Sequence, residues 1–202
     1  MSPANNKDAR VLSAIVRALR ENASPTKTFP ANARRAGVAL ILKALGKDLS
    51  ILFIQRAVRE EDPWSGHIAF PGGHYDRSDT DVLQTVVRET KEEVGITLTP
   101  SDCLSQLPFE KPYTSDQPTD LVVLPHVFVL THEPDINLNH EVSEVIWVSL
   151  AQLASGELIT YKTVHFNRKK YQLPGFLLND KQFVWGLTYR ILQRFFSIVG
   201  ET

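Results

Sequence analysis

Apolar residues form short continuous runs in the first third of the chain, and these runs predict β-strands. Residues 36–42 (AGVALIL) and 49–56 (LSILFIQR) each have the pattern of a buried strand, and Gly46-Lys47-Asp48 between them predicts a turn. Residues 161–173 predict a second hairpin, whose basic turn at 167–170 we expect to be solvated. Two antiparallel hairpins are therefore expected.

The longest strand-like run lies in the second half of the chain, at residues 120–130. Pro125 within it indicates a bulge or an edge position, because proline has no N–H to donate to a neighbouring strand. His126 could reach a functional site, but a single histidine in an apolar strand is more often a core residue. Residues 139–150 alternate polar and apolar side chains, as a half-buried strand does.

Both ends of the chain show the helical period. Residues 8–22 predict an amphipathic helix packed on the domain, and residues 182–199 predict a C-terminal amphipathic helix. A targeting presequence is the alternative for the N-terminal helix, but Asp8 and Glu21 argue against it because presequences contain few acidic residues. Two prolines within residues 23–32 predict an extended connector.

The composition is that of one globular domain of 202 residues, of which 43% are hydrophobic and 22% are charged. We expect residues 1–34 to form a helix and connector that pack on a domain formed by residues 35–202. A net charge of -1 gives no overall attraction to nucleic acid or anionic membrane, so an anionic ligand has to be bound locally. The single cysteine, Cys103, excludes an intramolecular disulfide. The single cysteine suits a reducing compartment, the N-terminal residues do not show the pattern of a signal peptide, and no apolar run is long enough for a membrane span. Together these features predict a cytoplasmic protein.

Three carboxylates lie within five residues near the middle of the chain. Glu89, Glu92 and Glu93 are spaced i, i+3 and i+4, so a helix places them on one face about one turn apart. Such a face is tolerated if it is solvated, or if a divalent cation such as Mg²⁺ lies among the carboxylates. The apolar residues on the other side of this helix and the glycines that precede it favour the cation.

The segments around the acidic helix predict how it begins and ends. Phe70-Pro71-Gly72-Gly73 has the pattern of a strand end followed by a turn, where glycine lets the backbone approach a ligand closely. Gly95 is suited to end the helix, with Ile96 as the hydrophobic contact that follows. Trp64, in the loop before this segment, either contacts substrate or packs the loop onto the core. We favour packing, because aromatic residues more often contribute buried area.

Residues 73–96 resemble the Nudix box, whose pattern is Gly, five residues, Glu, seven residues, Arg-Glu-hydrophobic-x-Glu-Glu-x-Gly-hydrophobic. The chain differs from this pattern at two residues and in one spacing. Asp79 replaces the first Glu, eight residues rather than seven separate it from Arg88, and Thr90 replaces an aliphatic residue. The Arg-Glu-x-x-Glu-Glu-x-Gly half is intact, and in the family that half carries the metal.

Further segments are similar to the branch of this family that cleaves coenzyme A. Residues 66–73 (GHIAFPGG) match the Gly-x-x-x-Phe-Pro-Gly-Gly end of its signature, and Arg56-Ala57 matches its Arg-Ser/Ala element. The second arginine of the signature would fall at Asp62, so that part does not match, although Arg59 is nearby and is a candidate replacement. The later segments that resemble the family are residues 141–150 and 184–192.

The resemblance implies an α+β fold in which a mixed β-sheet is sandwiched between α-helices (α/β/α), with a site for Mg²⁺ or Mn²⁺. The implied metal ligands are Glu89, Glu92, Glu93 and a carbonyl oxygen of the Gly73-His74 segment. The implied substrate contacts are Arg56, Arg59, Gly72 and Gly73. Arg88 would hold a carboxylate of the cluster or a phosphate oxygen.

The general base is left open between Glu92 and Glu141, and either Glu141 or Glu144 is a candidate further ligand or base. The implied reaction is hydrolysis of a diphosphate linkage in a small nucleotide substrate, with coenzyme A or a related nucleoside diphosphate derivative as the leading candidate. ADP-ribose, a sugar nucleotide or a nucleoside triphosphate is the alternative substrate.

A non-catalytic nucleotide-binding module on the same fold is the alternative function. The intact acidic set argues against it, because a binding module need not keep like charges on one helix face. No nucleic acid or membrane partner is expected, and a homodimer is left open.

Overall fold

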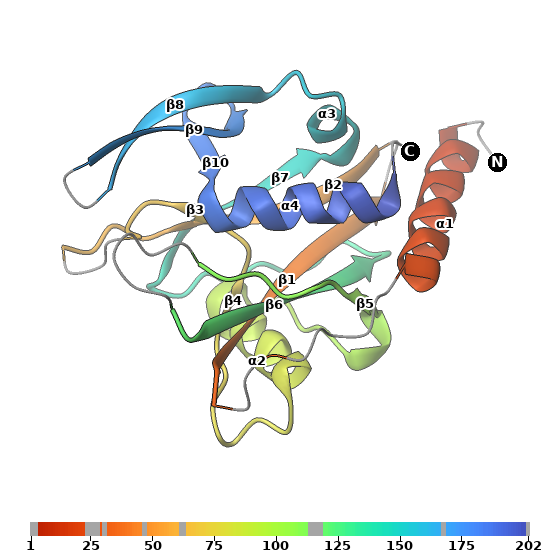
Figure 1. Ribbon diagram of the computed structural model, residues 1–202. Helices are drawn as coiled ribbons and strands as arrows, with labels where there is room; N and C mark the ends of the chain where they lie inside the picture. The colour runs from red at the N-terminus through yellow and green to blue at the C-terminus, as the bar shows by residue number, and fades with distance from the viewer. Residues whose placement is uncertain are drawn as a thin grey trace.

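The computed structural model describes residues 4–22, 29, 32–45, 48–60, 64–112, 119–166 and 169–200 (Figure 1). Its helices are α1 (Ala4–Asn22), α2 (Val82–Val94), α3 (Leu150–Ala154) and α4 (Gly186–Val199), with one 3₁₀ turn, η1 (Pro100–Asp102). Its strands are β1 (Arg34–Leu45), β2 (Asp48–Arg56), β3 (Ile68–Ala69), β4 (Gly72–His74), β5 (Cys103–Gln106), β6 (Leu121–Leu130), β7 (Val142–Ser149), β8 (Ile159–Phe166), β9 (Lys169–Leu178) and β10 (Gln182–Trp185).

The main sheet is mixed and opens between its two central strands. β1 runs parallel to β6 and antiparallel to β2, but it pairs with β2 only from Leu42 opposite Ile51 to Leu45 opposite Asp48. Beyond these residues the segment 68–74 fills the opening, because β3 pairs with β2 and β4 pairs with β1. The predicted hairpin is therefore confirmed, although the middle of its turn lies outside the described residues.

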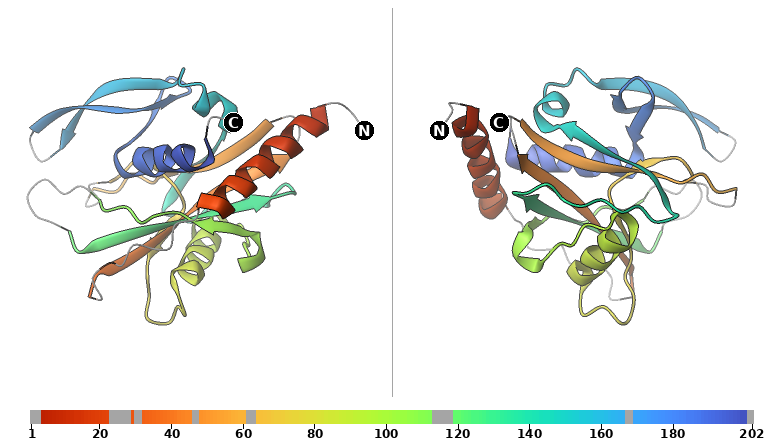
Figure 2. Two further views of the ribbon diagram at one scale, coloured as in Figure 1. Left: turned by 45° about the vertical axis from the view of Figure 1, so that its right-hand side comes forward. Right: turned by 180° about the vertical axis from the view of Figure 1, so that it is seen from behind.

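Helices cover both faces of this sheet (Figures 1 and 2). Ala39 and Ile41 of β1 pack in the core on the α2 side, whereas Leu40 and Leu42 pack in the core shared with α1, α4 and β8–β10. A strand that is buried on both faces has an apolar side chain at nearly every position, which explains the continuous apolar runs in the sequence. The predicted α+β fold with a mixed sheet between helices is confirmed.

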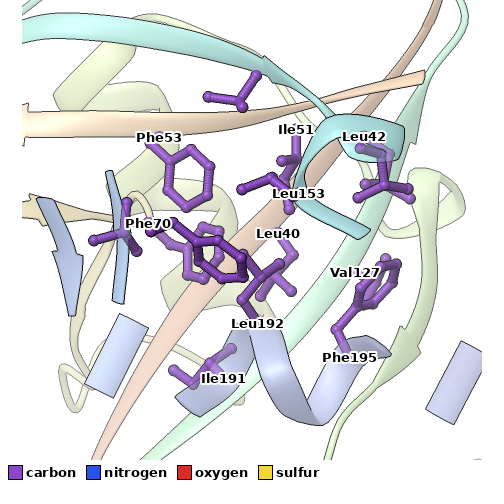
Figure 3. Packing of buried hydrophobic residues seen from close by; sticks show 14 of the residues in the cluster. Leu40, Leu42, Ile51, Phe53, Phe70, Val127, Leu153, Ile191, Leu192 and Phe195 are labelled. Atoms are coloured by element: carbon purple, nitrogen blue, oxygen red, sulfur yellow. The ribbon is translucent and has the colours of Figure 1, made fainter. Parts of the chain in front are cut away.

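Aromatic packing anchors the chain just before the two adjacent glycines (Figure 3). Phe70 stacks on Phe53 of β2 with ring centroids 5.1 Å apart and planes 23° apart. Leu192 and Phe195 of α4 are fully buried in the same cluster. Because Phe70 is held in this core, the backbone of residues 71–73 is fixed over the N-terminal half of β1.

Helix α2 has the ends that its sequence predicts. The Asp81 carboxylate accepts a hydrogen bond from Gln84 N at 2.8 Å, and Gly95 ends the helix with φ 78° and an N–H that donates to Lys91 O. Ile96 is buried directly after it, as expected for the hydrophobic contact of such an end. Thr90 is wholly buried at the position where an aliphatic residue is expected. Its hydroxyl has no hydrogen-bond partner among the described residues.

Two predicted elements are wrong in part. Residues 182–185 form strand β10 rather than the first turn of the C-terminal helix, because β9 offers an edge with which they pair in antiparallel register. Gly186, with φ 61°, separates the strand from α4. Gly72 and Gly73 lie in strand β4 rather than in a turn, because β1 has a free edge there once β2 has diverged.

Three single residues, Pro125, His126 and Trp64, were the subject of smaller predictions. Pro125 lies in β6, an interior strand of the sheet. Its carbonyl accepts from Leu107 N, just beyond the end of β5. The N–H that proline lacks would point to this same side, so the pairing of Pro125 with β1 is intact. His126 is a core residue, as favoured, with Nδ1 3.1 Å from Leu124 O and a pKa lowered by burial. Trp64 packs edge-on against His67 but is 38% exposed, so the favoured packing role is observed as a partly exposed contact.

The predicted helices and second hairpin are present, as α1, α4 and the pair β8–β9, with the hairpin tip outside the described residues. In the part of the chain that the structure describes, no helix is both long enough and apolar enough to cross a membrane.

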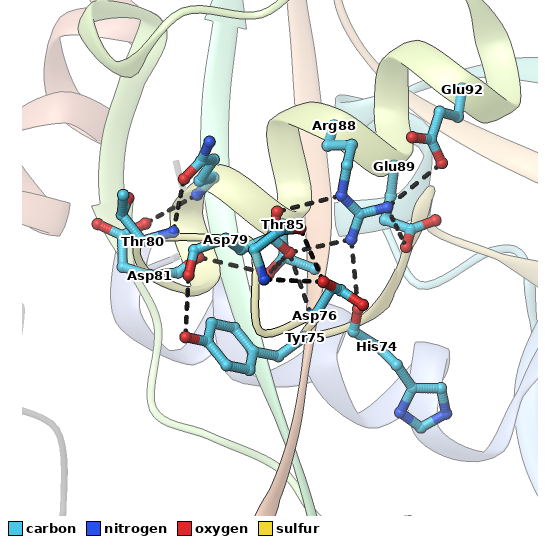
Figure 4. A network of polar contacts seen from close by, with 12 residues as sticks. His74, Tyr75, Asp76, Asp79, Thr80, Asp81, Thr85, Arg88, Glu89 and Glu92 are labelled. Carbon is cyan, nitrogen blue, oxygen red and sulfur yellow. Dashed lines mark hydrogen bonds and ion pairs between the residues drawn. The ribbon is translucent and has the colours of Figure 1, made fainter.

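A buried aspartate holds the loop between β4 and α2 (Figure 4). Asp79 accepts from Arg88 Nε at 3.1 Å and Nη2 at 3.0 Å, from the Thr85 hydroxyl at 2.8 Å and from Asp76 N at 3.2 Å. The hydrogen bonds from Arg88 are the main reason that the pKa of Asp79 falls from 3.8 to about 2. The residue that departs from the expected motif therefore ties the loop to the helix that carries the glutamates.

We expect Asp79→Asn to lower the free energy of unfolding by roughly 2 kcal/mol at pH 7, because it removes charged hydrogen bonds from a buried group. The lowered pKa means that this contribution is present above pH 3.8 and is lost as the pH falls through about 2. Urea denaturation of both proteins between pH 7 and pH 2 checks this, and the difference should shrink at low pH. Asp76→Asn is the control, since the exposed Asp76 side chain accepts from the backbone N–H and the hydroxyl of Ser78; an equal loss in both variants would contradict the assignment.

Candidate metal and substrate site

The three glutamates of α2 differ strongly in exposure. Glu93 is 2% exposed and its Oε2 accepts from Gly72 N at 2.8 Å. The Glu89 side chain is 18% exposed and that of Glu92 is 54% exposed. The helix face predicted from the i, i+3, i+4 spacing therefore runs from the sheet at Glu93 outward to solvent at Glu92.

Burial makes the charged form of Glu93 unfavourable. Desolvation is the main cause that raises the pKa of Glu93 to about 7, and the negative charges of Glu89 and Glu141 add to the effect. The N–H of Gly72 and the positive charge of Arg56 act in the opposite direction. Burial also raises the pKa of Glu89, against the hydrogen bond from Arg88. Two neighbouring carboxylates thus occupy a place where an additional positive charge would stabilise both.

Arg88 is the cation that neutralises the outer part of this cluster (Figure 4). Its Nη1 is 2.8 Å from Glu89 Oε1 and 3.3 Å from Glu92 Oε2, and its Nη2 donates to the carbonyl of His74 at 3.4 Å. The predicted contact of Arg88 with carboxylates of the cluster is observed. The same guanidinium also bonds Asp79, so one side chain connects the loop, strand β4 and the acidic face.

Close approach of two backbones explains the glycines of β4. A Cβ on Gly73 would lie 2.4 Å from Glu89 Cδ, and a Cβ on Gly72 would lie 2.1 Å from Gly37 O. Gly72 also has φ 149°, which side chains rarely adopt. The two glycines let strand β4 run directly between β1 and the carboxylates of α2.

The residues predicted from the loop after β2 lie near the cluster. Arg59 Nη1 is 3.5 Å from Glu141 Oε1, and Arg59 Nη2 donates to His140 O at 3.4 Å. The charge of Arg56 acts on Glu93, and that of Glu141 acts on both Glu89 and Glu93. The structure thus places Glu141 beside the cluster, near Arg59 of the loop that follows Arg56 at the end of β2.

Glu144, the other candidate acid, lies elsewhere. It pairs across the sheet with Gln55, accepts from Gln182 Nε2 at 3.1 Å and lines a cavity that none of the three α2 glutamates lines. Cross-strand partners share a face of the sheet, so Glu144 is on the face of Gln55 and not on that of the adjacent Arg56.

Asn139 is a site residue that the sequence analysis missed. Its Oδ1 accepts from Glu141 N at 2.8 Å, and its N–H donates to the carbonyl of Glu93 at 3.0 Å. It therefore links the end of α2 to the backbone that carries Glu141. An Asn two residues before the acid is the pattern of an Asx turn, which is the signal that would have found it.

The donor set fits a hard divalent cation. Glu89, Glu92 and Glu93 supply only oxygen atoms, and burial raises the pKa of the two more buried carboxylates, so a bound cation would stabilise their charged forms. In the part of the chain that the structure describes, however, no three acidic, histidine or cysteine side chains converge on one point as a preformed ion site. Arg88, which lies between Glu89 and Glu92, separates two of the three acids.

Comparison with known proteins agrees with this architecture. A model of the NUDIX domain matches residues 32–170. Protein C14C4.10c of Schizosaccharomyces pombe is 37% identical over 133 residues, which cover 63% of this chain but only 40% of that protein. The human mitochondrial coenzyme A diphosphatase NUDT8 is 31% identical over 169 residues, which cover 82% of this chain and 70% of the human one.

The fold agrees as well. A MutT/nudix family protein from Enterococcus faecalis superimposes with a TM-score of 0.59 at 20% identity, over 98% of this chain and 74% of the other. At that identity the likeness shows the fold alone. The family model, in contrast, covers well over half of the residues, and it includes β4, α2 and both loop arginines. The chain therefore belongs to the NUDIX family.

Proposed function

We propose that this chain is a divalent-cation-dependent pyrophosphohydrolase that cleaves a diphosphate linkage in coenzyme A or a related nucleoside diphosphate derivative. The observation that carries the proposal is the buried Glu93 carboxylate, held on Gly72 N–H beside Glu89 with a pKa raised to about 7. A negative group in so dry a place is unfavourable unless a cation shares it.

Glu89, Glu92, Glu93 and the carbonyl of Gly73 would hold Mg²⁺ or Mn²⁺. When bound, such an ion neutralises phosphate oxygens and lowers the pKa of a coordinated water. Arg88 would keep the outer carboxylates oriented, because its bonds to Asp79 fix the guanidinium in place. The NUDIX model match supports a divalent cation in general rather than one particular metal.

Arg56 and Arg59 would bind the phosphates of the substrate, and Gly72 and Gly73 would let the diphosphate approach the backbone. Both arginines lie on the side of the cluster that Glu141 also faces. A bidentate guanidinium contact suits a diphosphate, because the two N–H groups of the fork can bond two of its negatively charged oxygens.

Glu141 is the better supported of the two candidate bases. It is held between Arg59 and the Asn139 turn, and its charge acts on both inner glutamates. Glu92 is more than half exposed and is tied to Arg88. A positioned carboxylate is able to take the proton of the attacking water, whereas a solvated one is less constrained.

Coenzyme A leads the substrate candidates because the human relative is named a coenzyme A diphosphatase. ADP-ribose, sugar nucleotides and nucleoside triphosphates remain alternatives, as does a non-catalytic nucleotide-binding role. A product-resolved assay of these compounds side by side, with and without Mg²⁺ or Mn²⁺, distinguishes them. The cytoplasmic location and the homodimer stay predictions.

Glu93→Gln should lower diphosphate hydrolysis by at least about 100-fold, equivalent to ~2.7 kcal/mol, because it removes the charge that would hold the cation. The amide keeps an oxygen to accept from Gly72 N, so the fold should persist. Phosphate release with added phosphatase measures the activity, and thermal melting with and without Mg²⁺ measures ion binding. The control is Glu157→Gln, an exposed acid on another element; full activity in Glu93→Gln would refute the cation assignment.

Gly73→Ala should lower activity at least about tenfold, because the new Cβ would displace the Glu89 carboxylate from its place against β4. The expected signature is a higher divalent ion concentration for half-maximal activity in a folded protein. Gly156→Ala provides the control: it also adds a Cβ, at a glycine with φ 78° where the Cβ would lie 3.8 Å from Ile159 Cδ1, an ordinary contact distance. Equal activity of wild type and Gly73→Ala would argue against Glu89 as a ligand.

A further inference from the structure

A cavity of about 530 Å³ lies on the face of the sheet opposite α2. We call it the Trp185 pocket; its lining includes Gln55, His67, Glu144, Gln182, Phe183 and Trp185. Ile68, which lines it too, belongs to the core on the α4 side. Its size is within the range of small-molecule sites. The function proposed above makes no use of it.

Aromatic rings form one side of this pocket. His67 lies edge-on to Trp185 with ring centroids 5.0 Å apart, and Trp64 lies edge-on to His67 at 5.6 Å. Lys162 lies over the Phe183 ring at 5.3 Å. The rings of Trp64, His67 and Trp185 therefore continue from the pocket to the loop that carries Arg59. Such surfaces bind flat heterocycles by stacking.

The polar side of the pocket is formed by Gln55, Glu144, Lys181 and Gln182, of which Glu144 is the acidic acceptor. Gln182 Nε2 donates to Glu144 Oε2 at 3.1 Å, which orients the amide and turns its oxygen the other way. That oxygen, Gln182 Oε1, is buried and has no hydrogen-bond partner among the residues that the structure describes. The Glu144 carboxylate that this amide holds is exposed and lines the pocket, so it can accept hydrogen bonds from a ligand that brings N–H groups.

We propose that the Trp185 pocket binds the base of the substrate, as an aromatic heterocycle with an exocyclic amine of the adenine type. The amine donates to the Glu144 carboxylate, which Gln182 Nε2 orients, and the ring packs on Trp185. This inference rests on the proposed function for the other half of the substrate. It also explains why Glu144 lies apart from the acidic cluster: its carboxylate selects the base and takes no part at the diphosphate.

The pocket and the acidic cluster lie at the same end of β2. Gln55 lines the pocket, whereas the next residue, Arg56, acts on Glu93 from the other face. His67 and Gly72 are five residues apart, so their backbones are separated by at most about 17 Å. The pocket therefore lies close to the strand that carries Gly72 and Gly73.

The test is calorimetric titration of adenosine and inosine into the protein in EDTA, so that neither a cation nor hydrolysis is involved. Adenosine should bind saturably, and inosine at least tenfold more weakly, because an exocyclic carbonyl oxygen replaces the donating amine. Glu144→Gln should weaken adenosine binding at least tenfold and raise the KM for coenzyme A with a smaller change in kcat. Glu157→Gln, the matched acid on an exposed loop, should bind adenosine as wild type does.

Two results would overturn the proposal: no saturable adenosine binding, or equal binding by wild type and Glu144→Gln. Circular dichroism of Glu144→Gln shows whether the variant is folded, and Gln182→Leu is the second variant if it is not. Failure of the proposed function is distinguishable, since adenosine would then bind with the expected selectivity while no diphosphate is cleaved. Hydrolysis without adenosine binding would contradict the proposed role of the pocket and leave the proposed enzymatic function intact.

Discussion

The burial of one carboxylate against a backbone N–H is the constraint on which the rest of the site depends. Glu93 reaches Gly72 only because β4 lies in the opening between β1 and β2, where a side chain on either glycine would collide. The raised pKa of Glu93 is the energetic consequence of that burial. We propose that binding of a cation and a diphosphate offsets the unfavourable burial of this carboxylate.

A second layer of interactions keeps the acidic face from being distorted by its own charge. Asp79 holds Arg88, and Arg88 holds Glu89 and Glu92, so the loop after β4 and the outer half of α2 form one connected network. Asn139 performs a similar task on the other side, where it joins the end of α2 to Glu141. Asp79 thus has a structural role, although its side chain is shorter than the Glu of the family pattern and the segment between it and Arg88 is one residue longer.

The sheet itself separates two environments at the end of β2. Arg56 and Gln55 are adjacent in sequence but face opposite sides, toward the acidic cluster and toward the Trp185 pocket. Alternation of side chains across a strand puts the proposed phosphate-binding residue and a residue of the proposed base pocket at adjacent positions of one strand. The aromatic and apolar packing of Phe53, Phe70 and α4 keeps these two places in fixed relation.

The sequence alone determined the local features of this protein. The apolar runs of β1 and β2, the ends of α2 at Asp81 and Gly95, and the spacing of Glu89, Glu92 and Glu93 depend on neighbours within one or two turns, so pattern and residue type were sufficient. The tertiary structure decided what depends on distant pairing. In the tertiary structure Gly72 and Gly73 form a strand, residues 182–185 form β10 on the edge of β9, and Glu144 lies away from the cluster. No local pattern encodes which strand edge is free or which face a residue shares with a partner far along the chain, and these features set the burial of Glu93 and shaped the Trp185 pocket.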